Sequence, residues 1–565
     1  MTYWPDAKAC FKRHIGLSSK ALTRAGLHES TRNKYLSLVG QASGEGLQIE
    51  VLIDEHKQQV IRQNREKLVS IIDTIKLCGR LGLALRGHRD DSSYHPEVGS
   101  YSKGGVDSNR NVREDFVRFL HCKWGLSGES LEKLIHSALT ELKLSIEDCR
   151  GQGYDGAGAV AGHINGLSAR ILRLNSKAIY THCYSHRLNL AICNSCSVPF
   201  VRNVFSQIKE LSYFFNLSDG RQMLLSKAVE DYCPHSGKSK LKDVCRTRWI
   251  ERIDGLDIFQ ELFLPIFHTL TEMSHNAGHV CNPETSSKAS SFLALISTFR
   301  FIVSLVISRN ILDLTLPVTQ LLQAKTCDVM DGMHLIESLK NLGILLRNDV
   351  DLYHGKWYSE AVSLAKNVDV DEKMPRTAGR QVHNENHPSS SASDYYKKAL
   401  TIPFLDHLNS DLQARFDFSQ INVYNGFSVV PSKMISLINS LPPNKKNWKE
   451  NFRLDAELEL WEKFWTTYEG SLPDSAASTL KALGFEGFEN IKACLRLLAT
   501  LPVTSCECER SISALRMLKT YNRSTMVEER LNGLALMRIH QEIEPTVDEV
   551  INKFAYGNRR LELKL

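Results

Sequence analysis

The chain of 565 residues is 42% hydrophobic and 24% charged, which is typical of a soluble protein with two or three domains. Its 70 Lys and Arg residues against 64 Asp and Glu residues give a net charge of +6, which permits nucleic-acid contact without requiring it. The 14 scattered cysteines and the polar start argue against a secreted disulfide framework. The apolar stretch 292–307 is too short for a membrane span and carries Arg300, so a buried helix and no membrane contact are expected.

A long amphipathic helix is predicted within residues 45–86, where Leu68, Ile72 and Ile75 recur at spacings of three and four. Residues 87–112 have no periodicity and many turn formers, so they are predicted to form an irregular loop. The helix therefore leads into a core that begins after this loop.

Residues 113–254 alternate between strand and helix patterns. Strands are predicted at EDFVRFLHC, at the stretch entering GYDGAG, and at AIYTHC. Helices are predicted at 128–142, at about 162–174 and from Ser185 onward. This alternation indicates an α/β layered core.

The remainder of the chain is predicted to be helical. Residues 255–484 form an all-α segment, interrupted by a polar, aperiodic linker at 367–394. Residues 485–565 hold the densest helical signal, and their apolar stripes include Ile512, Leu515, Leu518, Leu531 and Leu534. Stripes of this length in a terminal segment usually bury against another domain or another chain.

Two carboxylates are candidates for chemistry. Asp155 follows a short strand in GQGYDGAG, where small residues allow close approach to a ligand, although an Asp there also commonly caps a turn. Glu509 is expected in the early turns of a helix that Thr504 or Ser505 would cap, and considered alone it is more simply a charge on the helix surface.

A cysteine and histidine cluster in THCYSHRLNLAICNSC raises the question of zinc. Cys183 and His186, followed by Cys193 and Cys196, resemble four ligands. The connecting RLNLAI reads as one face of a continuing helix, which would separate the two pairs, so no structural zinc is predicted. Trp249, with Arg248 and Arg252, could stack on a base and hold phosphates, or could be a core Trp with solvated arginines.

Together, GQGYDGA, HCYSHRLNLA, TRWIER and the long block LPVTSCECERSISALRMLKTYNRSTMVEERLNGLALMRIH resemble the ordered signatures of hAT-superfamily transposase-like proteins, closest to the TTF-type and MYM-type zinc-finger group. The resemblance implies a ribonuclease-H-like core interrupted by a large all-α insertion, with residues 485–565 completing the core and forming the C-terminal dimerisation region. It also implies two divalent cations, Mg²⁺ or Mn²⁺, held by three carboxylates, of which Asp155 resembles the second and Glu509 the third. Cys183 and His186 resemble a pair beside the active site, and Trp249 resembles a residue that stabilises flanking DNA.

The first carboxylate of the resembled family is missing. In the family it lies on the first core strand, between an LRGH block and the strand that reads EDFVRFLHC here, and residues 87–112 hold no such strand. Their end, VDSNRN, resembles the turn between the second and third core strands, so we expect a sheet that lacks its first strand and most of its second. Asp90, Asp91 and Asp107 lie nearby in loop sequence and are not expected to substitute.

The N-terminal residues 1–25 resemble the tail of a TTF-type zinc finger, in which His14 matches one ligand while the upstream cysteines are absent. Zinc binding by this remnant is not predicted.

Three hypotheses follow. The first is a nuclear, homodimeric, domesticated or remnant transposase-like protein, with DNA and other nuclear proteins as expected partners and without catalysis. The second is an active transposase with a displaced first carboxylate. The third is an interaction scaffold in transcriptional regulation.

Overall fold

The computed structural model describes most of the chain and leaves out several connecting segments and both ends. The described residues are 14–18, 55–81, 98–106, 112–242, 249–275, 281–324, 329–375, 387–416, 428–440, 455–485, 487–502, 504–519 and 526–555. Helices account for most of them, as the sequence predicted.

The chain divides into two compact units. The sheet unit comprises residues 1–183, 325–331 and 422–565, and the helical unit comprises residues 184–324 and 332–421. The helical unit thus begins at Tyr184, earlier than the expected residue 255, because helices in 184–232 pack on later helices of the same unit. Amphipathic patterns show that these helices have a buried face, but not which part of the chain covers that face.

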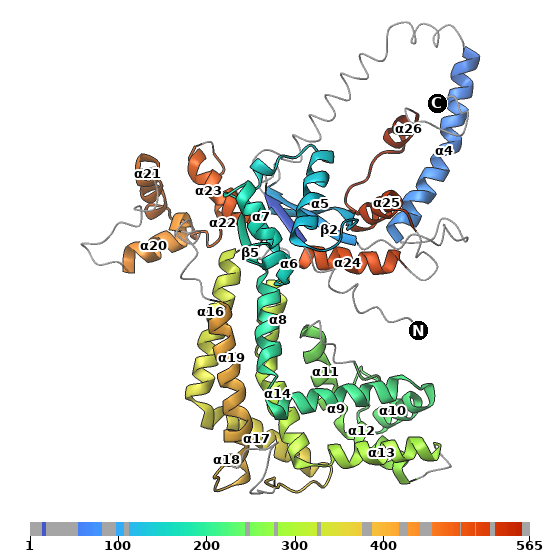
Figure 1. The fold of residues 1–565 in the computed structure, drawn as a ribbon, viewed down its shortest axis with the longest axis vertical. Helices are drawn as coiled ribbons and strands as arrows, with labels where there is room; N and C mark the ends of the chain where they lie inside the picture. The colour runs from blue at the N-terminus through green and yellow to red at the C-terminus, as the bar shows by residue number, and fades with distance from the viewer. Residues whose placement is uncertain are drawn as a thin grey trace. The chain divides into compact units, whose positions relative to one another are not determined.

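All described strands lie in the sheet unit (Figure 1). The elements of this unit are β1 (His14–Ser18), α4 (Glu55–Leu81), β2 (Val98–Val106), β3 (Val112–His121), α5 (Gly128–Glu141), the 3₁₀ helix η1 (Ile146–Asp148), β4 (Gly151–Tyr154), α6 (Gly158–Ala161), α7 (Leu167–Leu174), β5 (Ile179–His182), α20 (Pro431–Ser440), α21 (Asp455–Thr466), α22 (Ala476–Ala482), α23 (Glu489–Thr500), α24 (Cys506–Leu518), α25 (Glu528–Ile539) and α26 (Val547–Ala555).

The strands form two small sheets. In the first, β2 pairs antiparallel with β3 and parallel with β1. In the second, β4 pairs parallel with β5, with Gly151 opposite Ile179 and Tyr154 opposite His182. The predicted strands at EDFVRFLHC, before GYDGAG and at AIYTHC are confirmed as β3, β4 and β5.

The segment expected to be an irregular loop contains a strand. Residues 98–106 form the nine-residue β2, and Val106 pairs with Val112, so β2 and β3 make a hairpin around the VDSNRN sequence. The expected pairing of the second and third strands is therefore present. The expectation that most of the second strand is missing is wrong, because β2 has nine residues. The Gly- and Ser-rich sequence of β2 has no strand periodicity and a low strand propensity. Its extended conformation is stabilised by the hydrogen bonds to β3. Asp90, Asp91 and Asp107 lie outside the described residues.

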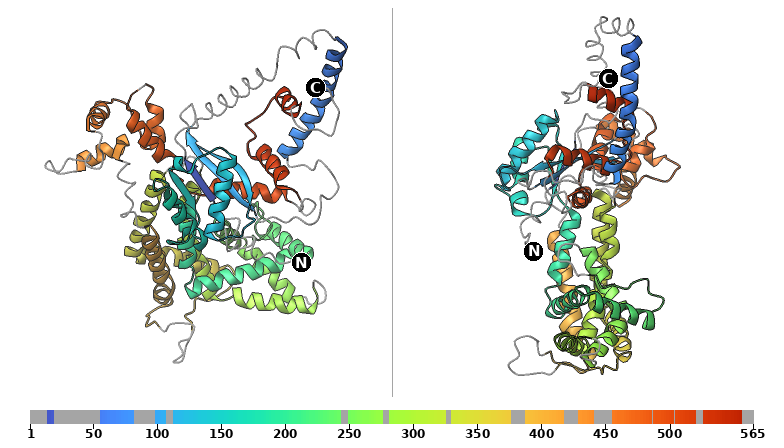
Figure 2. Two further views of the ribbon diagram at one scale, coloured as in Figure 1. Left: turned by 45° about the horizontal axis from the view of Figure 1, so that its top comes forward. Right: turned by 90° about the vertical axis from the view of Figure 1, so that its right-hand side faces the viewer.

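Two apolar clusters organise the sheet unit. One lies between α5, α7 and β4 and includes Leu131, Ile135, Tyr154 and Ile171. The other joins β3 to the C-terminal helices α24 and α25. The helix α4 lies alongside α25 and α26, as the views in Figures 1 and 2 show.

The helical unit contains twelve α-helices and one short π-helical turn among the described residues, and the first three residues of one of them, α16, are assigned to the sheet unit. They are α8 (Tyr184–Ser195), α9 (Pro199–Asn216), α10 (Asp219–Tyr232), α11 (Trp249–Glu261), α12 (Phe263–His275), α13 (Pro283–Ile296), α14 (Phe299–Asp313), α15 (Leu316–Leu322), α16 (Val329–Asn348), α17 (Val350–Lys366), α18 (Ala392–Tyr396), η2 (Lys397–Thr401) and α19 (Ile402–Arg415).

The helix α14 is the core of this unit. Phe299–Leu322, which spans α14 and α15, is apolar and long enough to cross a membrane, but 67% of its most apolar window is buried inside the protein. The single helix predicted at 292–307 is in fact two helices. The helix α13 ends at Ile296, and Thr298 caps the start of α14. The Arg300 guanidinium lies 4.7 Å from the centre of the Phe200 ring, which offsets the cost of placing a cation there.

Candidate functional site

The carboxyl end of β4 presents Asp155. All four residues of β4 are buried, and Asp155 is only 4% exposed. Its Oδ1 accepts a hydrogen bond of 3.2 Å from the Ala157 amide, so the carboxylate holds the turn that leads into α6. This is the structural alternative that the sequence left open for Asp155.

Cys183 joins the ends of β4 and β5 to the start of α24. Its amide donates to the Tyr154 carbonyl at 3.0 Å. Its Sγ accepts from the Ser505 amide at 3.3 Å and from the Ser505 hydroxyl at 3.1 Å, and Cys183 is 2% exposed. A thiol in this position acts as a buried acceptor that connects segments 322 residues apart.

The glycines of GQGYDG allow the segment before α24 to lie against β4. A Cβ on Gly153 would come within 2.8 Å of Pro502 Cβ, and one on Gly151 within 3.0 Å of Pro502 Cδ. Side chains at these positions would push the segment away. We call the contact of Gly153 and Cys183 with Pro502 and Ser505 the Cys183 junction.

Glu509 lies in the first turn of α24, as predicted. Ser505 occupies the N-cap position, and the Glu509 amide donates to its carbonyl at 3.1 Å. The Ser505 side chain does not cap the helix, because its hydroxyl donates to Cys183. The Glu509 side chain is exposed. Asp155 and Glu509 therefore border the same junction from opposite segments of the chain.

These two carboxylates do not complete a metal site in the described part of the chain. Three carboxylates are needed for the two-cation chemistry that the resemblance implies. Over the described residues, the group of His, Cys, Asp and Glu side chains close enough to share an ion contains neither Asp155 nor Glu509. The described residues thus place no third ligand with Asp155 and Glu509, and two carboxylates alone do not supply the chemistry of a two-cation centre.

Burial also raises the pKa of a cysteine beside β4, Cys149. Desolvation raises the pKa of the Cys149 thiol to about 12, and its Sγ donates to the Gly151 carbonyl at 3.3 Å. The thiol is therefore protonated at neutral pH and packs beside β4 as a small apolar group.

The predicted helix after β5 is confirmed as α8, which carries His186 in its first turn and Cys193 near its end. At about 1.5 Å of rise per residue, the helix places Cys193 roughly two turns, or about 10 Å, beyond His186. The Cys193 Sγ contacts Asn189 Oδ1 at 3.6 Å. The predicted separation of the two ligand pairs follows from this helix.

The candidate DNA-contacting residues are only partly described. Trp249 begins α11 and Arg252 lies in its first turn, but their side chains and the whole of Arg248 lie outside the described residues. His14 lies in β1, and its side chain is likewise outside the described set.

The five apolar residues proposed for dimerisation are buried within one chain. They are Ile512, Leu515, Leu518, Leu531 and Leu534, with exposed fractions of 0–7%. Four of them pack on Phe116 and Phe119 of β3. A surface for a second chain on these helices would be made by exposed neighbours, such as Met517 and Leu536.

The packing on β3 includes a polar clamp that the sequence did not reveal. Asn532 of α25 accepts from the Phe119 amide at 2.6 Å and donates to its carbonyl at 3.1 Å. The side-chain amide thus replaces a neighbouring strand at the edge of β3. We call Asn532 and the apolar cluster around Phe119 the β3 junction.

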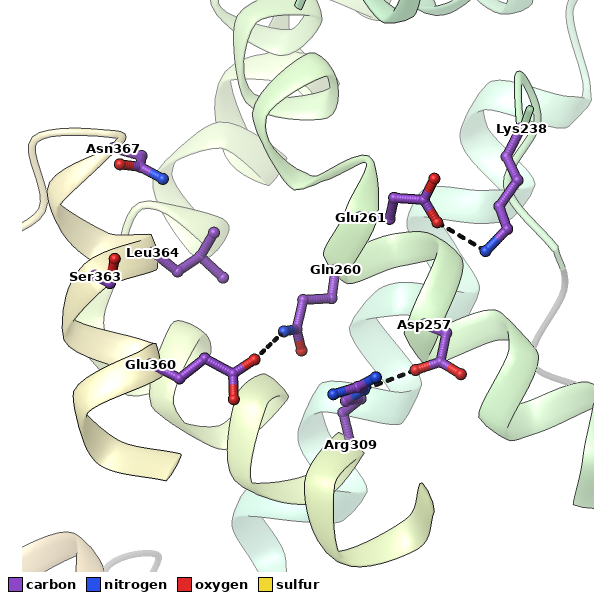
Figure 3. A pocket seen from close by; sticks show the side chains of 9 residues that line it. All are labelled: Lys238, Asp257, Gln260, Glu261, Arg309, Glu360, Ser363, Leu364 and Asn367. Carbon is purple, nitrogen blue, oxygen red and sulfur yellow. Dashed lines mark hydrogen bonds and ion pairs between the residues drawn. The ribbon is translucent and has the colours of Figure 1, made fainter. Parts of the chain in front are cut away.

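A separate cavity of about 710 Å³ lies in the helical unit (Figure 3). Its two cations pair with acids of the wall, Arg309 with Asp257 at 2.7 Å and Lys238 with Glu261 at 2.7 Å, and the third acid, Glu360, accepts a hydrogen bond from Gln260 at 2.7 Å. Hydrogen bonds from Lys238 and then Ser236 hold the pKa of the Glu261 carboxyl below its usual value. The charged groups of the wall are thus ion-paired or hydrogen-bonded to one another, which is typical of a solvated groove between helices.

Comparison with known proteins identifies two segments. Residues 105–166 match the family model described as the ZMYM1/FAM200 RNase-like domain, which here covers β3, α5, β4 and Asp155. Residues 487–543 match the hAT family C-terminal dimerisation region, which covers α23, α24 and α25.

Two similar full-length relatives carry the name "52 kDa repressor of the inhibitor of the protein kinase". The human protein is 29% identical over 465 residues, which cover 80% of this chain and 60% of the relative. The mouse protein is 28% identical, with 80% and 61% covered. The chain therefore spans about 60% of the length of these curated relatives.

Proposed function

Because the chain carries an RNase-like domain of the ZMYM1/FAM200 type and an hAT C-terminal dimerisation region, we propose that it is a domesticated, self-associating hAT-like protein without transposase catalysis. A ribonuclease-H-like core is part of this proposal. It is supported by the RNase-like match and by the parallel pair β4–β5 in the same unit as the β2–β3 hairpin.

The observation that carries the loss of catalysis is the environment of Asp155. Its carboxylate is buried and holds the turn to Ala157, while Glu509 is exposed and no third described carboxylate joins them as a ligand set. A two-cation centre for strand transfer would lack a ligand under these conditions.

The catalytic proposal is tested on DNA ends with Mg²⁺ or Mn²⁺. The purified chain is expected to yield no cleaved or joined product. Metal-dependent product that Asp155→Asn abolishes, and that Asp148→Asn on the nearby surface leaves intact, would overturn it. The alternative of a displaced first carboxylate predicts that substitution of Asp90, Asp91 or Asp107 abolishes the same product.

Self-association is proposed to use exposed apolar side chains on the C-terminal helices. Met517 of α24 is 60% exposed, and Leu536 of α25 is 39% exposed. The mass of the full chain in solution, measured by light scattering after size exclusion, should be that of a dimer, and Met517→Lys should shift it towards the monomer. The control Met223→Lys changes a 72% exposed Met of the helical unit and should leave the dimer intact. A monomeric wild type contradicts the proposal.

A role in transcriptional regulation is proposed by analogy with the relatives, whose name describes a repressor. This role implies a nuclear location, with DNA and other nuclear proteins as partners. Trp249, Arg248 and Arg252 remain the residues proposed to contact DNA. Charge-removing substitution of both arginines should weaken DNA retention and reduce its salt dependence, and unchanged retention would argue for protein partners alone.

A further inference from the structure

Three metal-ligating side chains converge where α25 ends beside the start of β3. Asp115 of β3, His540 at the C-cap of α25 and Glu542 just beyond it each offer one ligand atom, and these atoms lie within 4.8 Å of one another. We call this group the His540 cluster. It contains neither Asp155 nor Glu509, and the proposed function does not use it.

A hydrogen bond on the far side of the ring orients His540. The Nε2 atom lies 2.7 Å from the Phe116 carbonyl oxygen. A carbonyl can only accept, so Nε2 carries a proton and donates it. In the neutral ring, Nδ1 then has its lone pair free for a cation, which is the usual arrangement of a metal-binding histidine.

The opposite side of the ring faces negative charge. Nδ1 lies 3.5 Å from Glu542 Oε1, which is too long for a good hydrogen bond. A lone pair facing carboxylates is repelled by them, and either a proton on Nδ1 or a bound metal ion between the groups removes that repulsion. Ligand atoms bound to a tetrahedral Zn²⁺ at about 2.0–2.2 Å lie roughly 3.3–3.6 Å apart, and the observed spacing falls in this range.

The loop that carries Glu542 is fixed by the long helix α4. Lys76 Nζ donates to the Pro545 carbonyl at 2.6 Å, and Arg80 contacts the Gln541 carbonyl at 3.4 Å and Glu544 at 3.2 Å. The loop is therefore held in place by groups outside the cluster. Because the backbone of the loop is already ordered, binding of an ion costs little conformational entropy, which favours affinity.

We propose that Asp115, His540 and Glu542 bind one divalent transition-metal ion, with Zn²⁺ as the best fit. One imidazole nitrogen with two carboxylate oxygens suits Zn²⁺ better than Ca²⁺ or Mg²⁺, which prefer oxygen ligands alone. Asp115 lies in the RNase-like match, whereas His540 and Glu542 lie in the dimerisation region. The ion would thus tie the C-terminal region to the sheet and stabilise their contact.

The test uses the full chain freed of metal with a chelator and titrated with Zn²⁺ by calorimetry, and with Co²⁺ by visible absorption. Zn²⁺ should raise the thermal midpoint of the wild type. Glu542→Gln and Asp115→Asn should each lower the affinity at least about tenfold, since even loss of a group that only supports a ligand costs 10–100-fold. The matched control Glu529→Gln removes an exposed charge from the first turn of α25, outside the cluster, and should bind as the wild type does.

Cysteines elsewhere could also bind Zn²⁺, and Co²⁺ separates the two cases. Thiolate ligation gives intense sulfur-to-metal charge-transfer absorption, whereas the His540 cluster has no sulfur. Binding without that absorption, lost in both carboxylate variants, supports the proposal. Absence of binding, thiolate absorption at the first equivalent, or equal affinity in wild type and both variants overturns it. A chelated variant with the wild-type thermal midpoint shows that the substitution itself did not unfold the chain.

Discussion

The C-terminal region packs on the sheet unit at two places that are built differently. At the Cys183 junction, the Pro502 ring lies directly on the glycine backbone of β4, and Ser505 donates twice to the buried Cys183 sulfur. At the β3 junction, side chains fill the space, with Leu515, Leu518 and Leu531 around Phe119 and one amide clamp.

The difference predicts that the two junctions tolerate substitutions differently. Close backbone contact has no room for an added atom but loses little when one is removed. An apolar cluster can accept a side chain of similar volume but not a cavity. The Cys183 junction should therefore be sensitive to enlargement, and the β3 junction to truncation.

The largest effect is expected for Leu518→Ala. Leu518 is fully buried in the β3 junction, so its truncation leaves a cavity and should cost about 2–5 kcal/mol. The loss of stability is measured by hydrogen–deuterium exchange of the backbone amides of β3 and α25, which should be faster than in the wild type. Leu518→Met keeps the volume and should cost less than about 1.5 kcal/mol. Equal exchange in both variants would refute the apolar account of this junction.

Gly153→Ala should destabilise the Cys183 junction by about 1–3 kcal/mol, because the new Cβ would come within 2.8 Å of Pro502. Faster exchange at the start of α24 should report the change. Gly158→Ala adds the same methyl group where nothing lies within 4 Å, and it should be close to neutral. If both variants behave alike, close packing does not explain Gly153.

Asn532→Leu should cost about 1–2 kcal/mol, because it leaves the partly buried amide and carbonyl of Phe119 without their partner. Exchange of the Phe119 amide should accelerate more than that of buried amides in α5. A protected Phe119 amide in the variant would show that another group covers the edge of β3.

The smallest effect is expected for Cys183→Ala, about 1 kcal/mol, since Ser505 loses an acceptor but no cavity of consequence forms. Cys183→Ser retains an acceptor and should recover part of the loss. Chemical denaturation of the full chain compares the two variants. A Ser variant less stable than the Ala variant would indicate that the sulfur acts through its size and apolar character.

Much of the architecture was readable from local patterns. The alternation in EDFVRFLHC, the run into GYDGAG and the helices after them correspond to β3, β4, α5 and α7. Periodicity fails for β2, whose Gly- and Ser-rich sequence carries no alternation and is paired by β3. It fails again at residues 184–232, where helices expected in the core belong to the helical unit.

The candidate site was readable only in outline. The order of the motifs located Asp155 and Glu509, and the strand and helix that carry them are where the pattern placed them. The hydrogen bonds of Ser505 to Cys183, the fit of Pro502 on Gly153 and the amide clamp of Asn532 join residues hundreds of positions apart. The periodicity of apolar residues along the sequence describes local structure only, so it does not predict contacts between distant segments.

By itself, the sequence determined the helical character of the chain, its hAT-type signatures and the presence of a buried apolar stripe at the C-terminus, because composition and spacing act locally. Only the tertiary structure decided what that stripe covers. Leu515, Leu518, Leu531 and Leu534 bury against β3 of their own chain. The hydrophobic effect favours burial without specifying a partner, so the choice between another chain and this chain's own sheet depends on which apolar surface the fold brings near.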